Sequence, residues 1–333
     1  RDAAIQGIRD LLGLESDQPI PAQDIECVKM GTTVATNALL ERKGEPTIFV
    51  TTQGFADVLQ IGYQSRPKLF DRQIKLSEML YDRVIEVRER VAADGSIVIP
   101  LNEVEVLESL SSALASGITS IAIAFVHGYR YQEHEQRVAQ IAKEIGFTQV
   151  SVSSDISPLV KLVSRGDTTV VDAYLSPILR RYVEQVQSEL NGVQLMFMQS
   201  NGGLTDASRF QGKDAILSGP AGGVVGMVRS AGMAGYDQLI GFDMGGTSTD
   251  VSHYNGELER SLETTVAGVR LRAPMLSIHT VAAGGGSVLS VQGSRLRVGP
   301  DSAGANPGPA SYRRGGPLAV TDCNVMLGKI QPD

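Results

Sequence analysis

The sequence between residues 239 and 252, LIGFDMGGTSTDVS, combines residue types that suit the binding of a phosphate group. An apolar run ends at Asp243, and two glycines and several hydroxyl residues separate this aspartate from Asp250. Glycines can adopt positive φ and let backbone N–H groups approach phosphate oxygens, while hydroxyls add further donors. A carboxylate at a strand end can hold Mg²⁺ or orient a water. The residues of this predicted phosphate loop are Asp243, Gly245, Gly246, Thr247, Thr249 and Asp250, with Asp243 as the ligand of Mg²⁺.

A plain β-hairpin is the alternative interpretation of this segment, because apolar strands flank the glycines on both sides. Phosphate binding is favoured, since a structural turn does not require two aspartates and two threonines. The segment is not a P-loop, because the chain has no GxxxxGK[ST] sequence, and it is not a dinucleotide fingerprint, because no GxGxxG follows the first strand. It matches the DxGGT loop of actin-like and sugar-kinase-like ATPases.

Two further glycine clusters are candidates for the same chemistry. Gly284, Gly285 and Gly286 follow a short strand signal, and they either face the nucleotide or mark a close crossing of two backbone segments. Ser218 and the glycines after it open an apparent helix at about 222–231, whose N-terminus is either an anion site or an ordinary capped end. Both interpretations remain open for each cluster.

Alternating strand and helix signals indicate an α/β fold with a mostly parallel sheet in the first half. The expected helices cover residues 1–13, 31–40, 102–115, 132–145, 222–231 and a long stretch from 166 to 186, and the expected strands cover 26–29, 47–51, 121–125, 149–152, 195–198 and 239–243. A hairpin is expected around Asp94-Gly95, between strands 84–87 and 97–100. We expect the second half to repeat this organisation, with the domain boundary just before residue 165.

The composition indicates a folded protein that acts on a small molecule. Of 333 residues, 42% are hydrophobic and 20% are charged, which is not the composition of a disordered chain. The net charge of −7, without clustered Lys and Arg, argues against nucleic acid as a partner. No apolar stretch approaches the roughly 18 residues of a membrane span. Cys27 and Cys323 lack CxxC spacing, and the four histidines lack metal-ligand spacing, so a reducing compartment and no zinc site are expected.

Several blocks of the sequence, together with the predicted phosphate loop, resemble the hydantoinase A/5-oxoprolinase family. The blocks are MGTTVATNALLERKG (30–44), GYQSRPKLFD (62–71), SNGGL (200–204), LSGPAGGVVG (217–226), TVAAGGGS (280–287) and VGPDSAGANPGPASYRRGGPLAVTD (298–322). The resemblance covers nearly the whole chain. It implies an α/β, actin-like ATPase architecture of the sugar kinase, Hsp70 and ribonuclease-H-like type, with two lobes, residues 1–164 and 165–333.

The resemblance implies a cytoplasmic enzyme that uses ATP and Mg²⁺ to hydrolyse a cyclic amide through phosphorylation of the amide oxygen. Met30 is similar to the oxoprolinase branch, which implies conversion of 5-oxo-L-proline to L-glutamate. A hydantoin-ring hydrolase, an ATP-dependent ketone carboxylase subunit and, in another class, an actin- or chaperone-like ATPase switch are the alternatives.

By the same resemblance, candidates for the substrate cleft are Gly31, Thr32, Thr33, Asn37, Arg66 and Asn201. The implied partners are a hydantoinase B-type domain or subunit and further copies of the chain in a homo-oligomer. The chain departs from the family in having Ala310-Ser311 where many relatives have Ala-Cys, and in lacking a first DxGGTxTD loop. We therefore expect a fragment with weak or no ATP hydrolysis of its own.

Overall fold

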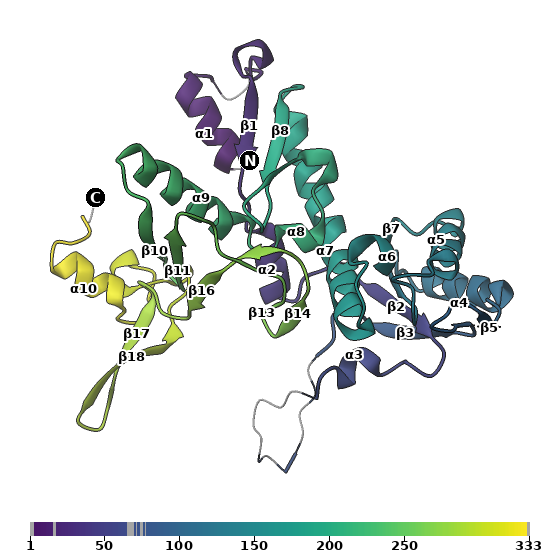
Figure 1. Ribbon diagram of the computed structural model, residues 1–333. Coiled ribbons are helices and arrows are strands. Elements are labelled where there is room, and N and C mark those ends of the chain that lie inside the picture. Colours follow the sequence, from purple (N-terminus) through teal and green to yellow (C-terminus); the bar gives the residue numbers. More distant parts are fainter. Residues whose placement is uncertain are drawn as a thin grey trace. The chain divides into compact units, whose positions relative to one another are not determined.

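The computed structural model of the chain describes residues 3–15, 18–64, 70, 72–73, 76 and 78–331 (Figure 1). Its contacts divide the chain into two compact units. Unit 1 comprises Arg1–Gly219 and Ser261–Met275, and unit 2 comprises Pro220–Arg260 and Leu276–Asp333. This division differs from the expected boundary before residue 165, because helix α7 (Leu162–Glu189) packs within unit 1.

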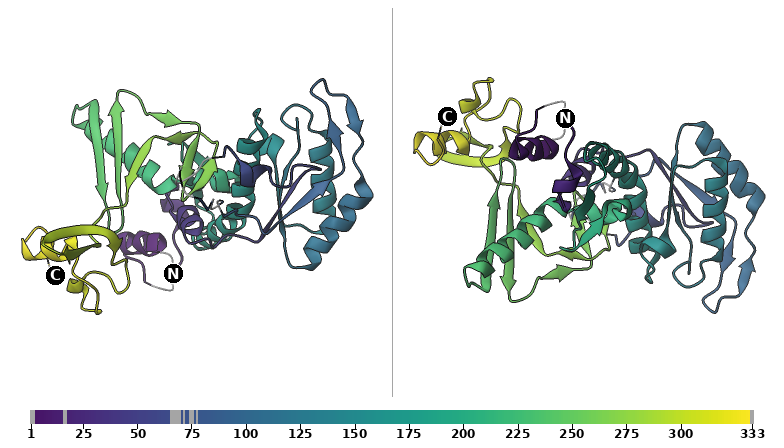
Figure 2. Two further views of the ribbon diagram at one scale, coloured as in Figure 1. Left: turned by 90° about the horizontal axis from the view of Figure 1, so that it is seen from below. Right: turned by 90° about the horizontal axis from the view of Figure 1, so that it is seen from above.

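Unit 1 contains a parallel four-stranded sheet in the order β3-β2-β6-β7. Its strands are β2 (Thr47–Thr52), β3 (Arg83–Val87), β6 (Ser120–Ala124) and β7 (Gln149–Val152). Alternate residues of β2 enter two cores. Phe49 joins the core that contains α7, whereas Ile48 and Val50 join the core with α4 (Glu103–Ala115) and α5 (Glu133–Ile145). Helices therefore cover both faces of the sheet, as expected for parallel strands (Figure 2).

The remaining elements of unit 1 gather around α7, which is buried along most of its 28 residues. A second sheet has the order β1-β8-β9, from β1 (Cys27–Met30), β8 (Gln194–Met198) and β9 (Leu204–Asp206). The hairpin of β13 (Thr264–Val266) and β14 (Val269–Leu271) also packs on α7. The shorter helices are α1 (Ala3–Leu12), α2 (Val34–Leu40), α3 (Val58–Ile61), α6 (Ser153–Ile156) and α8 (Gly212–Ala215).

The expected pairing of strand 84–87 with strand 97–100 is wrong. Strand β3 instead joins the parallel sheet beside β2, with Ile85 opposite Val50. The Asp94-Gly95 turn connects two shorter strands, β4 (Arg90–Val91) and β5 (Ile97–Ile99). The turn was therefore located correctly, but burial of β3 in the parallel sheet outweighs the local hairpin signal.

Unit 2 is built mainly from antiparallel strands, so the expected repetition of the first half is wrong. Its three-stranded sheet has the order β10-β11-β16, from β10 (Gln238–Met244), β11 (Thr249–Asn255) and β16 (Ile278–Val281). A long hairpin joins β17 (Ser287–Gln292) to β18 (Arg295–Ser302). Helix α9 (Ser218–Met233) begins at the end of unit 1 and continues into unit 2, and helix α10 (Val320–Met326) lies near the C-terminus. Two short strands, β12 (Arg260–Ser261) and β15 (Met275–Leu276), lie where the chain passes between the units.

The α/β class is confirmed, and the long helices lie close to where their periodicity predicts them. Helices α4 and α5 match the expected ranges within one residue, whereas α9 is longer than expected at both ends. In the described part of the chain, no helix is both long enough and apolar enough to cross a membrane. Both cysteines are free thiols.

Candidate functional site

The predicted phosphate loop forms the turn of the hairpin between β10 and β11. The N–H of Gly245 donates to the carbonyl of Ser248 at 2.9 Å and closes the turn. Gly246 and Thr247 are exposed at its tip, where no described residue accepts a hydrogen bond from their N–H groups. The hairpin interpretation is thus confirmed for the backbone. It does not exclude phosphate binding, because the tip presents free N–H groups.

Packing does not explain why glycine occupies position 246. Neither Gly245 nor Gly246 has a positive φ, so the backbone conformation does not require glycine at either position, contrary to our expectation. A Cβ added to Gly246 would meet no described atom within 4 Å. The open space at Gly246 is therefore suited to the close approach of a ligand.

The second glycine cluster crosses the hairpin turn at close range. The N–H groups of Gly285 and Gly286 donate to the carbonyls of Gly245 and Gly246 at 2.9 and 2.7 Å. A Cβ added to Gly284 would lie 2.6 Å from the carbonyl oxygen of Gly245, closer than real Cβ contacts. The close-crossing interpretation therefore holds for this cluster, and these hydrogen bonds hold the turn in place.

A third segment, at the N-terminus of α10, completes the arrangement. The N–H and hydroxyl of Thr321 both donate to the carbonyl of Gly285, at 2.7 and 2.8 Å. The carboxylate of Asp322 accepts hydrogen bonds from the N–H groups of Ser311 at 2.7 Å and Ala310 at 3.2 Å. Burial acts to raise the pKa of Asp322, but these hydrogen bonds outweigh it and the pKa is lowered. The ionised carboxylate thus orders the loop that faces the glycine turns.

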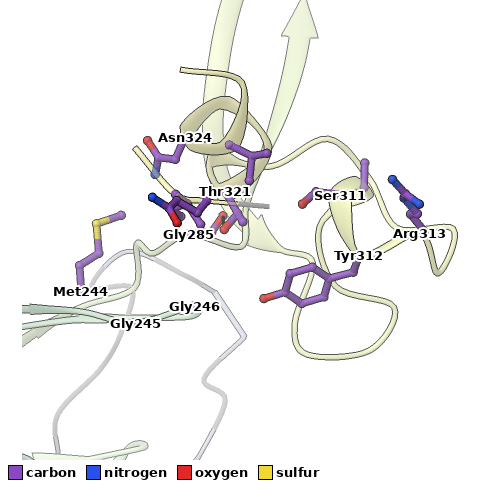
Figure 3. Close-up of a pocket in the computed structure, with 13 residues that line it drawn as sticks. Met244, Gly245, Gly246, Gly285, Ser311, Tyr312, Arg313, Thr321 and Asn324 are labelled. Carbon is purple, nitrogen blue, oxygen red and sulfur yellow. Dashed lines mark hydrogen bonds between the residues drawn. The ribbon is translucent and has the colours of Figure 1, made fainter. Parts of the chain in front are cut away.

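These three segments enclose a pocket of about 830 Å³, here called the glycine pocket (Figure 3). Its lining residues are Met244, Gly245, Gly246, Gly285, Ala310, Ser311, Tyr312, Arg313, Thr321, Asn324, Val325, Ile330 and Gln331. Figure 3 shows the ring of Tyr312 directed toward the side where Gly245 and Gly246 lie. The pocket combines backbone, hydroxyl and amide groups with an aromatic ring and aliphatic side chains, and its lining contains no carboxylate. That composition suits a nucleotide, whose phosphates need donors and whose base needs an apolar surface.

The two predicted aspartates line a different surface of the hairpin, here called the aspartate hollow. Asp243 and Asp250 lie opposite each other on β10 and β11. Together with Ser252 and residues of α9 such as Gly223 and Met227 they border a space of about 430 Å³. Neither aspartate lines the glycine pocket. The two parts of the predicted motif therefore adjoin along one hairpin, yet face two separate cavities.

The pair of aspartates has the chemistry of a Mg²⁺ site. Like charges directly opposite each other across a sheet destabilise it, so a cation between them would be favourable. Asp250 accepts a hydrogen bond from the hydroxyl of Thr280 at 2.6 Å, and Asp243 is exposed. Among the described residues, no cluster of three or more His, Cys, Asp or Glu could hold a metal. Two carboxylates fit Mg²⁺, which keeps several waters and often binds through one or two carboxylates.

Thr249 has a structural partner rather than a free hydroxyl donor. Its side chain is buried and donates to the carbonyl of Ala283 at 2.6 Å. This bond fixes β11 to the segment that leads into the second glycine cluster. Thr247, by contrast, is exposed at the turn, so of the two threonines only Thr247 has a hydroxyl placed for a ligand.

The substrate-cleft candidates at the start of α2 pack against another motif block of unit 1. The N–H of Thr32 donates to the hydroxyl of Ser218 at 3.1 Å, and the N–H of Gly219 donates to the carbonyl of Thr32 at 3.1 Å. A Cβ at Gly31 would lie 3.3 Å from the carbonyl oxygen of Ser218. The Ser218 hydroxyl therefore joins two segments and is not shown to cap α9.

The other cleft candidates have separate positions. Thr33 precedes α2, and its carbonyl accepts the N–H of Asn37 at 2.8 Å as part of the helix start. The side chain of Asn201 accepts the N–H of Gly203 at 2.7 Å in the turn between β8 and β9. None of these side chains lines the glycine pocket. Arg66 lies outside the described residues.

The sequence interpretation missed the side chains that face the glycine turns, which come from residues 311–325. Ser311, Tyr312, Thr321 and Asn324 line the glycine pocket. They belong to or follow the block 298–322, in which the sequence analysis considered only the departure from the family at residues 306–311. Its density of glycines and prolines was the available signal, because such loops often carry function.

Both halves of the chain match models of one protein family. Residues 165–333 match the model described as hydantoinase/oxoprolinase, and residues 1–146 match the hydantoinase/oxoprolinase N-terminal region. One match ends at residue 146 and the other begins at residue 165, whereas the compact units divide the chain at other positions.

Curated relatives and a solved structure agree with these matches. The chain is 46% identical to 5-oxoprolinase 1 of Arabidopsis thaliana and 45% identical to 5-oxoprolinase of Saccharomyces cerevisiae, covering 100% of this chain and 29% of each relative. The crystal structure of the ATP-dependent caprolactamase from Pseudomonas jessenii superposes with a TM-score of 0.80 at 33% identity, over 98% of this chain and 49% of that one. The chain thus spans less than a third of the length of the two oxoprolinases. The structural similarity confirms the expected actin-like α/β architecture.

Proposed function

Because the chain belongs to the hydantoinase/oxoprolinase family, we propose that it is the nucleotide-binding part of an enzyme that hydrolyses 5-oxo-L-proline to L-glutamate with ATP. Identities of 46% and 45% to two 5-oxoprolinases favour this substrate over other cyclic amides. Within the chain, we propose two lobes, residues 1–164 and residues 165–333.

The observation that carries the proposal is the exposed turn at Gly246 and Thr247, whose free N–H groups lie beside the glycine pocket. At the tip of the hairpin, the N–H groups of Gly246 and Thr247 have no described acceptor, and the turn borders a pocket of about 830 Å³. A methyl group at position 246 would meet no protein atom, so the turn is open to a ligand. Backbone N–H groups of Gly246 and Thr247 are suited to hold phosphate oxygens of ATP. Tyr312 and the aliphatic residues of the glycine pocket are suited to its base.

The chemistry explains why ATP is needed. A five-membered lactam is a stable amide that water opens slowly. Transfer of the γ-phosphoryl group to the amide oxygen makes the ring carbon electrophilic, so that water adds there and the C–N bond opens to give an acyl phosphate. A second water then hydrolyses the acyl phosphate and releases phosphate. The net products are ADP, phosphate and glutamate. Positioning and stabilisation of developing charge supply most of the acceleration in such transfers.

Asp243 and Asp250 are the proposed carboxylates of this reaction. Mg²⁺, when bound between them, would neutralise phosphate charge. Asp243, which is exposed and opposite Asp250, would hold the ion directly or through water. Asp250, oriented by Thr280, completes the pair or orients the attacking water.

The remaining partners and the location are proposed from the family membership. A hydantoinase B-type domain or subunit would complete the enzyme, which would form a homo-oligomer. Two free thiols are in keeping with a reducing, cytoplasmic compartment. No nucleic acid or membrane partner is proposed.

The test is Mg²⁺-dependent release of ADP by the native polypeptide that contains this chain. We expect stimulation by 5-oxo-L-proline with formation of glutamate, and little stimulation by hydantoins or by ketone with bicarbonate. Stimulation only by hydantoins, by caprolactam or by ketone with bicarbonate would assign the chain to another branch of the family. Release of ADP that is independent of every small substrate would favour an ATPase switch instead.

A further inference from the structure

The hairpin of β17 and β18, here called the apolar ribbon, is a two-stranded sheet of unit 2 with two chemically different faces. Residues opposite each other on antiparallel strands have side chains on the same face, as do residues two positions apart on one strand. One face is therefore apolar and consists of two cross-strand pairs, Val291 with Leu296 and Leu289 with Val298. The other face is polar and consists of Ser290 with Arg297 and Gln292 with Arg295.

The apolar face is uncovered over most of its length. The exposed fractions of its side chains are 71% for Val291, 86% for Leu296 and 63% for Val298. Figure 1 shows the turn of the ribbon projecting away from the other elements of unit 2. A two-stranded ribbon without further packing is marginally stable in water, and a contiguous exposed apolar patch is typical of an interaction site. The outer part of the ribbon therefore requires a surface that covers it.

The polar face indicates which side of the ribbon stays in water. Arg295 and Arg297 are exposed, and among the described residues neither has a hydrogen-bond or ion-pair partner. Burial of an unpaired arginine would be costly, so the polar face remains solvated. The apolar face, whose removal from water is favourable, is the side that a partner covers.

The size of the apolar face distinguishes between candidate partners. Its three exposed side chains offer on the order of 300 Å² of apolar surface, at about 100 Å² each. A stable interface between two free proteins buries about 800 Å² on each partner, so the ribbon alone is too small to hold a second copy or a separate subunit. Contacts between domains of one polypeptide begin at about 600 Å², counted over both sides, because covalent linkage replaces free association. The ribbon matches a contact within one polypeptide.

Both ends of the ribbon are joined to the glycine cluster that crosses the β10-β11 turn. At the start of β17, the hydroxyl of Ser287 accepts a hydrogen bond from the N–H of Gly284 at 3.1 Å. Directly after β18, the N–H of Ala303 donates to the carbonyl of Gly286 at 2.8 Å. The N–H of Gly286 in turn donates to the carbonyl of Gly246 at 2.7 Å. A contact that fixes the ribbon therefore also restricts the backbone that holds the β10-β11 turn.

We infer that the apolar face of the ribbon docks on polypeptide outside residues 1–333 of the native protein, and that this contact steadies the β10-β11 turn. Such polypeptide is present in the two similar oxoprolinases, because this chain spans 29% of the length of each. The partner surface is apolar where it faces Leu296, since the arginines lie on the opposite face of the ribbon. The effect on ATP rests on the proposed function, whereas the docking does not.

The test of docking compares two adjacent positions on opposite faces of the ribbon, in the native polypeptide that contains this chain. Leu296→Cys places a thiol on the apolar face, and Arg297→Cys, the matched control, places one on the polar face. Both positions are exposed in unit 2, so the thiols should react with a maleimide at similar rates unless a partner covers the apolar face. Mass spectrometry of the ribbon peptide measures each rate apart from other cysteines. We expect Leu296→Cys to react at least tenfold more slowly, and equal rates would overturn the inference.

A photoreactive maleimide on Ser294→Cys, in the turn of the ribbon, identifies the partner. We expect a cross-linked product with the mass of a single polypeptide, joined to a peptide outside residues 1–333. A product with twice that mass would show a second copy, and a product with the added mass of another protein would show a separate subunit. Either product, a cross-link within residues 1–333, or the absence of any cross-link would overturn the assigned partner.

The link to the β10-β11 turn has its own readout, the affinity of the native polypeptide for ATP in isothermal titration calorimetry. The double variant of Val291→Thr and Leu296→Thr replaces apolar contacts by hydroxyl-bearing side chains that still favour a strand. We expect its ATP affinity to fall at least fivefold, whereas Arg297→Thr on the polar face should bind ATP normally. Circular dichroism establishes that both proteins are folded. Unchanged ATP affinity in the folded double variant would overturn the link.

The outcome is separable from that of the proposed function. The thiol rates are measured without nucleotide, so slow reaction of Leu296→Cys would establish docking even if the glycine pocket does not bind ATP or the double variant fails to fold. Normal ATP binding by a protein whose two thiols react at equal rates would refute only the assignment of the ribbon.

Discussion

Two cavities among the described residues, one in each unit, use different kinds of groups. The glycine pocket of unit 2 is formed by the crossing glycine turns and by side chains from residues 310–331, with no carboxylate among its lining residues. A cavity of about 180 Å³ in unit 1 is lined by side chains of α7, of the β13-β14 hairpin and of the segment before β3, with the part-buried ion pair of Asp167 and Arg270 in its wall. Backbone N–H groups suit phosphates, which are recognised by many donors at close range. The difference indicates how each cavity can be tested. A glycine-to-alanine substitution should perturb the glycine turns of unit 2, whereas removal of a charged group should perturb the ion pair of unit 1.

Removal of the carboxylate beside the phosphate turn should have the largest effect. We expect Asp243→Ala to lower Mg²⁺-dependent ADP release by roughly 10²–10³-fold, because charge on the transferred phosphoryl group is no longer balanced. Folding should be retained, since Asp243 is exposed and its removal relieves repulsion with Asp250. Asp237→Ala, just before the same strand, is the matched control and should keep full activity. Normal turnover by folded Asp243→Ala would remove Asp243 from the site.

The close crossing in unit 2 predicts a structural glycine within the same motif region. Gly284→Ala should destabilise the protein by about 1–3 kcal/mol, because the new methyl would meet the backbone at Gly245 and push the two turns apart. Gly223→Ala in α9 meets no atom within 4 Å and is the control, expected to unfold at or above the wild-type temperature. Thermal unfolding by calorimetry compares them. A Gly284→Ala protein as stable as the control would show that the crossing is looser than described.

The buried pair in unit 1 predicts a dependence of stability on pH. Burial raises the pKa of Asp167 from 3.8 to about 6, against the opposing effect of Arg270. The folded state therefore favours the protonated acid, so this stabilising contribution is complete below pH 3.8 and is lost as pH rises through about 6. The loss is on the order of 3 kcal/mol, at 1.36 kcal/mol per pKa unit.

The free energy of unfolding of wild type and of Asp167→Asn, measured with denaturant at several pH values, isolates this contribution. The contributions of the other carboxylates are the same in both proteins and cancel in the difference. The free energy of unfolding of wild type relative to the variant should fall between pH 4 and pH 7. A difference that stays constant, or rises with pH, would mean that Asp167 is ionised throughout and that Arg270 dominates its environment.

The sequence predicted the elements better than their contacts. Apolar periodicity located α4, α5 and the strands of the parallel sheet, since these patterns are local. The pairing of residues 84–87 was predicted wrongly, because a turn at Asp94-Gly95 signals a hairpin without specifying which strands it joins. The antiparallel pairing in unit 2 was also not predicted, because a short apolar run does not indicate whether a strand pairs in parallel or antiparallel direction.

The candidate site was also predicted only in part, because its motif is local whereas its contacts join distant segments. The motif at 243–250 located the hairpin turn, but not that its aspartates and its glycines border separate cavities. Tyr312 and Asn324 were missed, since a loop sequence does not tell which side chains point into a pocket. Asp167 and Arg270 are 103 residues apart, and an ion pair at that separation has no sequence pattern.

The most direct test of the account is the affinity of the native polypeptide for Mg²⁺ and ATP in the wild type and in Gly246→Ala, measured by isothermal titration calorimetry. The methyl group touches no described atom, so the fold should be unchanged, as unfolding temperature and circular dichroism will report. If phosphate oxygens approach the turn, the methyl group blocks them, and ATP affinity should fall at least tenfold. A folded Gly246→Ala protein that binds ATP as tightly as the wild type would contradict the assignment of this turn as the phosphate site.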